Sequence, residues 1–179
     1  SKKIYQRINK AKIVNIHPLQ ITTTNTSKKK NFFLAINELS LLRQSKQTAF
    51  LKLKLNNKIL IKKLIGDGIL VSTPAGSTAY NLSVHGPILS LNSKKLAVTP
   101  ISPFRPRRWK GKIVSDKTKI YISNIDSKKR PIAAVADNNE IRNIATVKII
   151  INKRIKCKLL FNSKESLIKK IKLEQKKTA

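Results

Sequence analysis

Residues 66–80 combine residue types that favour binding of a phosphate or another polar ligand. They read Gly-Asp-Gly-Ile-Leu-Val-Ser-Thr-Pro-Ala-Gly-Ser-Thr-Ala-Tyr and include three of the chain's five glycines. Free backbone N–H groups at a helix start after the Pro-Ala-Gly turn attract anions, and small side chains let a ligand approach the backbone. Asp67 can accept hydrogen bonds from an amide or a hydroxyl. The same pattern also fits an ordinary strand, turn and helix capped by Ser77 or Thr78.

The elements around this segment are predicted to be mostly β-strands. Residues 50–55 alternate strictly between leucine and lysine after Phe50, Asn56-Asn57 suits a two-residue turn, and residues 58–65 return as the partner strand. Turn residues separate the other apolar runs at short intervals, which predicts an all-β sandwich or similar packed sheets. These further strands are expected at residues 11–16, 32–36, 69–72, 96–99, 119–123, 131–136, 146–151 and 155–161.

Three segments depart from the strand pattern. Residues 77–84 lack alternation and are predicted to form a short helix after the turn. Residues 162–175 are predicted to form a terminal helix, because Asn162 and Glu165 resemble a capping box. Residues 100–112, which contain three prolines and the only tryptophan, are expected to be an extended loop. The sequence therefore predicts one mainly β domain over residues 1–179, with its core at about residues 13–161.

The formal net charge of +31 invites a nucleic-acid interpretation, because basic residues neutralise phosphates. However, 31 of the 39 basic residues are lysine, and lysine, isoleucine and asparagine share A/T-rich codons. The basic residues are also scattered, often opposite leucine or isoleucine on strands. Mutational bias at tolerant surface positions is therefore favoured over selection for RNA binding.

Several cellular contexts are disfavoured by the sequence. The longest apolar runs, such as residues 132–136, are far too short to span a membrane. No apolar stretch follows the basic start, so a secretory signal is not expected. The single cysteine, Cys157, cannot form an internal disulfide and is expected to be a buried, inert thiol. A reducing cytoplasm fits these features.

The motifs as a set resemble those of the NAD kinase family, in its bacterial form. Residues 66–80 are similar to the family's Asp-Gly and Ser-Thr-Pro-x-Gly-Ser-Thr-Ala-Tyr signature, and Asn37-Glu38 is similar to its Asn-Glu motif. The resemblance covers roughly residues 13–175, with the motifs in the family's order. The remaining matching segments are residues 17–19, 39–45, 85–88, 96–109, 134–137 and the expected terminal helix.

This resemblance implies the carboxy-terminal, NAD-binding part of an enzyme that transfers a phosphoryl group to the 2′-hydroxyl of the adenosine ribose of NAD. The donor is ATP or, in some members, polyphosphate, and the complete enzyme uses a divalent cation such as Mg²⁺. Members form homodimers or homotetramers. Asn37 and Glu38 would contact NAD on its adenosine side, Asp67 would hold the other end, and Tyr80 would lie against an aromatic ring. The residues implied to contact NAD are Asn37, Glu38, Asp67, Thr78, Ala79, Tyr80, Asn81, Leu82 and Ser83.

One family motif has no counterpart here. NAD kinases carry a Gly-Gly-Asp-Gly motif in an amino-terminal α/β domain, and its aspartate is taken as the catalytic base. This chain contains no Gly-Gly pair, so we expect no catalytic residue and no metal ligand in it, and we expect the chain alone to be inactive. His85 is expected to be structural, and Asn139 receives no role. Two alternatives stay open: a dinucleotide-binding module without catalysis, and a basic RNA-binding protein.

Overall fold

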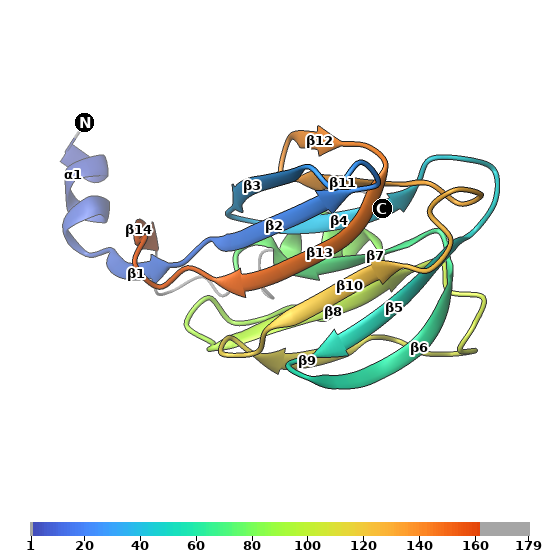
Figure 1. Ribbon diagram of the computed structural model, residues 1–179. Helices are drawn as coiled ribbons and strands as arrows, with labels where there is room; N and C mark the ends of the chain where they lie inside the picture. Colours follow the sequence, from blue (N-terminus) through green and yellow to red (C-terminus); the bar gives the residue numbers. More distant parts are fainter. Residues whose placement is uncertain (1, 162–179) are drawn as a thin grey trace.

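The computed structural model describes residues 2–161, and they form two six-stranded antiparallel sheets that pack face to face (Figure 1). In the first sheet the strand order is β3-β2-β13-β10-β5-β6. Its strands are β2 (Leu19–Asn25), β3 (Lys30–Ala35), β5 (Ala49–Leu55), β6 (Lys58–Gly66), β10 (Ile120–Asn124) and β13 (Ile144–Ile151).

The second sheet carries most of the motifs found in the sequence. Its strand order is β12-β11-β4-β7-β8-β9. The fully buried β7 lies at its centre, between β4, which follows the Asn-Glu motif, and β8. Its strands are β4 (Glu38–Arg43), β7 (Gly68–Ser72), β8 (Lys95–Ile101), β9 (Lys112–Ser115), β11 (Ile132–Ala136) and β12 (Asn139–Ile141).

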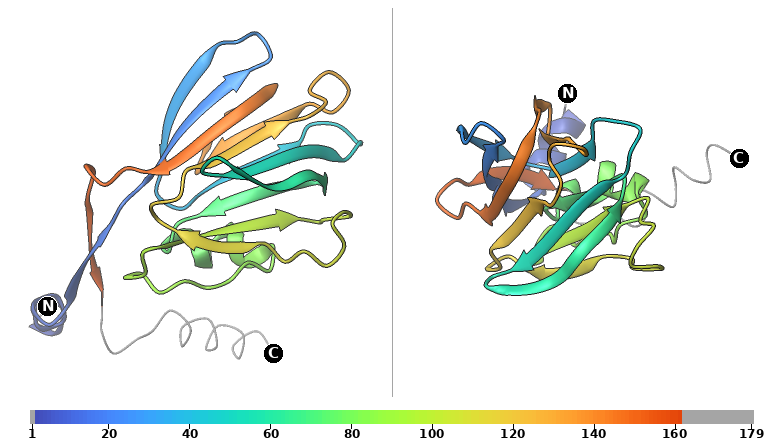
Figure 2. Two further views of the ribbon diagram at one scale, coloured as in Figure 1. Left: turned by 60° about the horizontal axis from the view of Figure 1, so that its bottom comes forward. Right: turned by 45° about the vertical axis from the view of Figure 1, so that its right-hand side comes forward.

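A two-stranded ribbon extends from the sandwich. It consists of β1 (Lys12–Ile16) paired antiparallel with β14 (Cys157–Phe161), and helix α1 (Lys2–Asn9) precedes it. Figure 2 shows this ribbon and α1 projecting away from the two sheets. His17, where the ribbon joins the sandwich, is hydrogen-bonded through Nδ1 to the Ile155 carbonyl oxygen at 2.8 Å.

The β5–β6 hairpin shows how the alternating sequence builds the sandwich. Leu51 and Leu53 are 1% and 0% exposed in the core, whereas Lys52 and Lys54 face outward. Asn56 adopts φ of 53°, a conformation that asparagine tolerates, at the tight turn. Side chains from both sheets fill the core at alternate positions, which is the usual arrangement in a sandwich.

The predicted mainly β fold is confirmed, and each strand expected from the sequence overlaps a strand of the structure. Strands β2, β4, β9 and β12 and helix α1 were not expected. The predicted loop at residues 100–112 is shorter, because its ends belong to β8 and β9. The helix expected at residues 162–175 lies outside the described residues. Cys157 is half-buried on the ribbon, so the prediction of a buried thiol was wrong.

Between β7 and β8 the chain forms two short helical turns in place of the single helix expected at residues 77–84. These are η1 (Gly76–Thr78) and α2 (Tyr80–Ser83), separated by Ala79 at φ of −96° and ψ of −132°. Within residues 2–161, no helix is long and apolar enough to cross a membrane.

Candidate nucleotide-binding site

The site is centred on a turn at residues 36–38, which joins β3 to β4. The Asp137 carboxylate accepts hydrogen bonds from three successive backbone N–H groups of this turn. The distances are 2.7 Å from Ile36, 3.0 Å from Asn37 and 3.2 Å from Glu38. The Asp137 N–H donates in return to the Glu38 carbonyl oxygen at 3.1 Å. The carboxylate therefore holds the Asn-Glu motif against the β11–β12 hairpin.

The segment after β7 holds the same turn from its other side. The Thr73 hydroxyl donates to the Ile36 carbonyl oxygen at 2.7 Å and accepts from the Gly76 N–H at 3.1 Å. The Thr73 N–H donates to the Asn37 carbonyl oxygen at 2.9 Å. A Cβ atom on Gly76 would lie 2.2 Å from that oxygen. Glycine at this position is thus what allows the Gly-Ser-Thr-Ala-Tyr segment to pack directly on Asn37.

Glu38 occupies an unusual electrostatic position in the turn. Burial, and secondarily the negative charge of Asp137, raise the pKa of the Glu38 carboxyl group to about 7. Its Oε2 atom is buried and has no hydrogen-bond partner among the described residues. The structure thus presents a buried carboxyl group that can exist in either protonation state near neutral pH.

The two short helical turns are fixed by buried polar side chains. The Ser77 hydroxyl donates to the Pro74 carbonyl oxygen at 2.7 Å and accepts from the Leu89 N–H at 3.0 Å. Asn81 is 0% exposed, and its amide donates to the carbonyl oxygens of Ser77 and Pro87 and accepts from the Thr99 hydroxyl. The structure therefore places Asn81, a predicted NAD contact, as an internal support of the helix.

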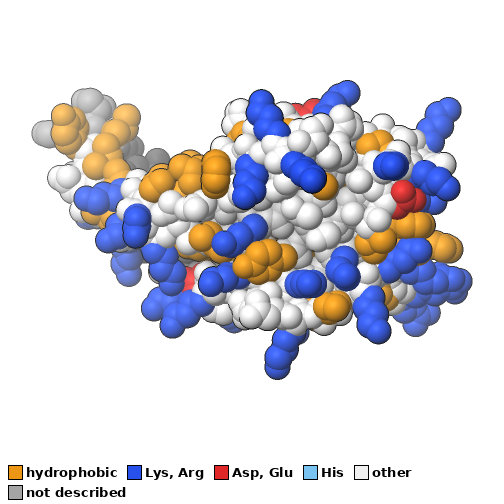
Figure 3. Space-filling model, viewed as in Figure 1, with side chains coloured by type: hydrophobic (Ala, Val, Ile, Leu, Met, Phe, Trp, Pro, Cys, Tyr) orange, Lys and Arg blue, Asp and Glu red, His pale blue; other side chains and the backbone are white. Residues whose placement is uncertain are grey.

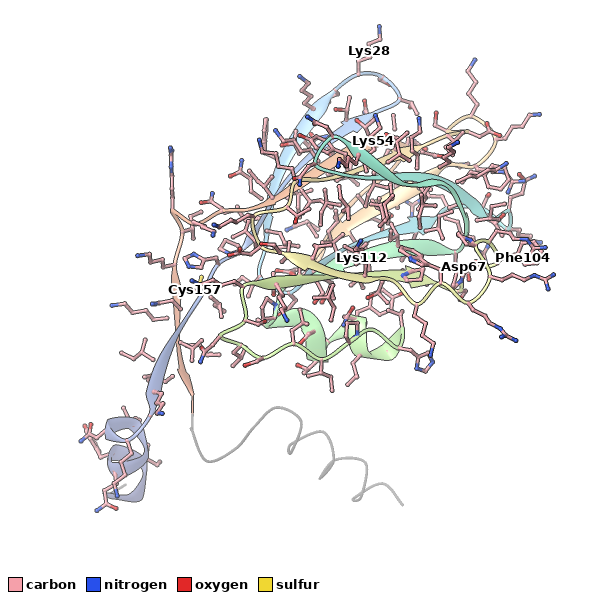
Figure 4. All side chains as sticks on the ribbon, turned by 90° about the horizontal axis from the view of Figure 1, so that it is seen from below. Lys28, Lys54, Asp67, Phe104, Lys112 and Cys157 are labelled. Carbon is pink, nitrogen blue, oxygen red and sulfur yellow. The ribbon has the colours of Figure 1, made fainter. Side chains whose placement is uncertain are left out.

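Two hollows flank α2. The first has a volume of about 620 Å³ and is lined by Asp67, Tyr80 and Arg43 among others. In it, the Arg43 guanidinium forms an ion pair with one oxygen of Asp67, and both side chains are 36% exposed. The second, of about 610 Å³, is lined by Ser83, His85 and Trp109, and Ile101 borders both. Figure 4 places Asp67 at one end of the sandwich beside Phe104.

The predicted contact residues therefore fall into two groups at opposite ends of β4. Asn37 and Glu38 lie at the 36–38 turn, where Gly76 packs on Asn37, whereas Asp67 and Tyr80 line the first hollow. Thr78, Ala79 and Leu82 are half-buried along the helical turns that connect the two groups, and Ser83 is exposed. Sequence reasoning missed the roles of Asp137 and Arg43, although residues 134–137 had been noted as a family motif.

A family model described as the ATP-NAD kinase C-terminal domain matches residues 36–156, which include the turn, the helices and Asp137. The chain belongs to the NAD kinase family. An NAD kinase of Zymomonas mobilis is 45% identical over 172 residues, which are 96% of this chain and 67% of that protein. One of Rhizorhabdus wittichii is 43% identical over 94% of this chain and 66% of its own length. The chain thus spans about two thirds of these relatives.

Solved structures of NAD and NADH kinases share the fold. A yeast NADH kinase complexed with NADH superposes with a TM-score of 0.82 at 23% identity, over 96% of this chain and 51% of that one. An Archaeoglobus fulgidus NAD kinase in complex with ATP gives a TM-score of 0.71 at 21% identity, over 91% of this chain and 61% of that one. At these identities the likeness establishes the fold alone, and the family assignment rests on the sequence matches.

Proposed function

We propose that this chain is the NAD-binding part of an NAD kinase, an enzyme that transfers the γ-phosphoryl group of ATP to the 2′-hydroxyl of the adenosine ribose of NAD. The observation that carries the proposal is the meeting of three separate motifs at residues 36–38. Asp137 and Thr73 hydrogen-bond to this turn, and Gly76 packs on it. A turn held from two sides is a preorganised ligand contact, because little conformational freedom is lost on binding.

Each predicted residue has a role in this proposal. Asn37 and Glu38 contact the adenosine side of NAD from the turn that Asp137 and Thr73 hold in place. The Asp67 oxygen not engaged by Arg43 accepts a hydrogen bond from the other end of the dinucleotide. Tyr80, which is 36% exposed, offers a ring face to a base or nicotinamide. Thr78, Ala79, Leu82 and Ser83 line the path between them, and Asn81 supports that path from inside.

The proposal names no side chain of this chain as a ligand of the phosphoryl donor or of the metal ion. ATP and a divalent cation such as Mg²⁺ belong to the proposed complete enzyme. Residues 2–161 bring together no group of three or more histidine, cysteine, aspartate or glutamate side chains that could hold a metal. The proposed task of the described residues is to bind and orient NAD.

The proposed setting is a cytoplasmic homodimer or homotetramer. A second candidate function, dinucleotide binding without catalysis, is kept because the chain contains no Gly-Gly-Asp-Gly motif. In both candidates the chain binds NAD at the same site, but NADP is formed only in the first.

Turnover separates the two candidates experimentally. The 179-residue chain should bind NAD in a calorimetric titration but form no NADP with ATP and Mg²⁺. A chimaera that adds the amino-terminal segment of the Zymomonas mobilis relative should form NADP. The same chimaera with Asn37→Ala should show a raised KM for NAD. Binding without turnover in a folded chimaera would favour the module, and absence of NAD binding would overturn both candidates.

A further inference from the structure

The outer face of the first sheet gathers basic and aromatic side chains that lie far apart in the sequence. Directly paired residues of antiparallel strands point to the same face of a sheet. Pairing across five strands places one row in register, which we call the aromatic row: Phe32, Thr22, Lys148, Tyr121 and Lys54. Pairing across the same strands gives a neighbouring row, the hydroxyl row: Lys30, Thr24, Thr146, Ser123 and Lys52.

All members of the two rows except Lys52 line a shallow hollow of about 780 Å³. Phe32 is 69% exposed, and the Lys148 ammonium lies 6.0 Å from the centre of the Tyr121 ring. Farther along the same sheet, Lys63 and Arg130 stack on the Phe50 ring at 3.9 and 3.8 Å. The hollow therefore combines cations, hydroxyl groups and open aromatic rings.

The charge of this face has one sign. None of the six strands contains an aspartate or a glutamate. Figure 3 views the sheet from outside and shows blue basic side chains across it, with red acidic side chains only near its margin. Two copies of the chain placed face to face here would bring like charges together, which is costly. The face is suited to a polyanion and not to a second copy.

We propose that this face binds single-stranded nucleic acid, a function separate from the dinucleotide site. Base stacking on aromatic side chains of a sheet, with lysines on the phosphates, is a recurrent mode of single-strand recognition. Phe32 and Tyr121 lie three strand spacings apart, roughly 14 Å, and Lys30 and Lys52 lie four apart, roughly 19 Å. The hydroxyl row between the two lysines provides donors for phosphate or sugar oxygens.

The first test asks whether the face, and not the overall charge, binds the strand. Fluorescence anisotropy with a labelled oligouridylate should be measured over a range of salt concentrations. The full chain is compared with a face variant that combines Lys30→Gln, Lys54→Gln and Lys148→Gln. The control variant removes the same charge in and beside β8 and β9 of the second sheet, through Lys94→Gln, Lys112→Gln and Lys117→Gln. Each lysine that neutralises a phosphate of a single strand contributes roughly 0.7 to the slope of log affinity against log salt concentration. The face variant, which lacks three lysines, should therefore lower the magnitude of this slope by about 2. Equal effects of the two triple variants would overturn the proposal.

The second test addresses stacking. Phe32→Ser alone should weaken oligouridylate binding by roughly tenfold, and its combination with Tyr121→Ser should weaken binding further. Tyr121→Phe should retain it, because the ring is kept. Linear polyphosphate of matched charge should bind more weakly than oligouridylate. Equal binding of polyphosphate, or no loss in Phe32→Ser, would overturn the assignment to nucleic acid. The NAD affinity of each variant should equal that of the parent chain. This result would show that the fold is intact and that the nucleic-acid face is distinct from the proposed dinucleotide site.

Discussion

Asp137 and Glu38 form a pair of carboxyl groups with opposite tasks. The Asp137 carboxylate is used as an acceptor by three backbone N–H groups, whereas one Glu38 oxygen is buried without a partner among the described residues. Asp137 thus fixes the backbone of the turn, whereas Glu38 keeps a buried carboxyl oxygen without such a partner. This division could not be read from the sequence, because the two residues are separated by 99 positions.

The raised pKa of Glu38 predicts a specific pH dependence of stability. The folded state holds the proton up to a pH of about 7, whereas the unfolded chain loses it near 4.5. The contribution of Glu38 to stability is therefore present below pH 4.5 and is lost as the pH rises to about 7. Glu38→Gln should remove this part of the pH dependence in denaturant unfolding. An unchanged pH profile in the variant would show that Glu38 titrates normally.

Asp137→Asn isolates the carboxylate, because asparagine tolerates the positive φ of 49° at this position. Loss of charge-assisted hydrogen bonds to the 36–38 turn should cost about 2 kcal/mol of the free energy of unfolding. NAD affinity should fall as well, since Asn37 and Glu38 are no longer held. Chemical denaturation and calorimetric titration of NAD check the two effects. Full stability with full affinity would mean that the turn does not depend on the carboxylate.

At the scale of elements, the sequence predicted the regular strands better than the site. Strict alternation at residues 50–55 specified the β5–β6 hairpin, and the apolar run at residues 69–72 specified the central β7. β2 was missed because only Leu19 and Ile21 of its inward-facing residues are apolar, and the third, Thr23, is polar. β4 was missed because its first residues were considered only as a ligand motif. The packing of η1 on Asn37 depends on tertiary contact, which no local pattern records.

That packing predicts that Gly76→Ala disrupts the contact between two motifs. The added Cβ would lie 2.2 Å from the Asn37 carbonyl oxygen, so the backbone must shift. We expect a loss of about 1–3 kcal/mol in the free energy of unfolding and a loss of roughly tenfold or more in NAD affinity. Ala75→Gly, one residue earlier and free of any clash, is the control and should cost no more than about 1 kcal/mol. Equal behaviour of the two variants would contradict the packing argument.

At the scale of the whole molecule, the sandwich separates two surfaces. The proposed dinucleotide site lies at the 36–38 turn and beside α2, whereas the basic rows lie on the outer face of the first sheet. The sequence motifs led to the first of these proposals. The second was judged to be scattered charge, because strand pairing, which brings residues 30, 54 and 148 together, is invisible in a linear sequence.

The separation predicts that lysines of the outer face do not contribute to NAD binding. Lys52→Gln with Lys54→Gln should leave the melting temperature and NAD affinity nearly unchanged, because exposed charges contribute little individually. Thermal melts and NAD titration provide the measurement. A large loss of NAD affinity would show that the two surfaces are coupled.

The most direct test of the account is a calorimetric titration of NAD into the chain and into its Asp67→Asn variant. A hydrogen bond from a ligand to a carboxylate contributes on the order of 1.5–3 kcal/mol, so the variant should bind roughly tenfold or more weakly. Its melting temperature should stay close to that of the parent, because the ion pair with Arg43 is partly exposed. Ser72→Ala, at a fully buried position, is the control and should keep its affinity. An unchanged affinity in Asp67→Asn, or no NAD binding by the parent chain, would contradict the account.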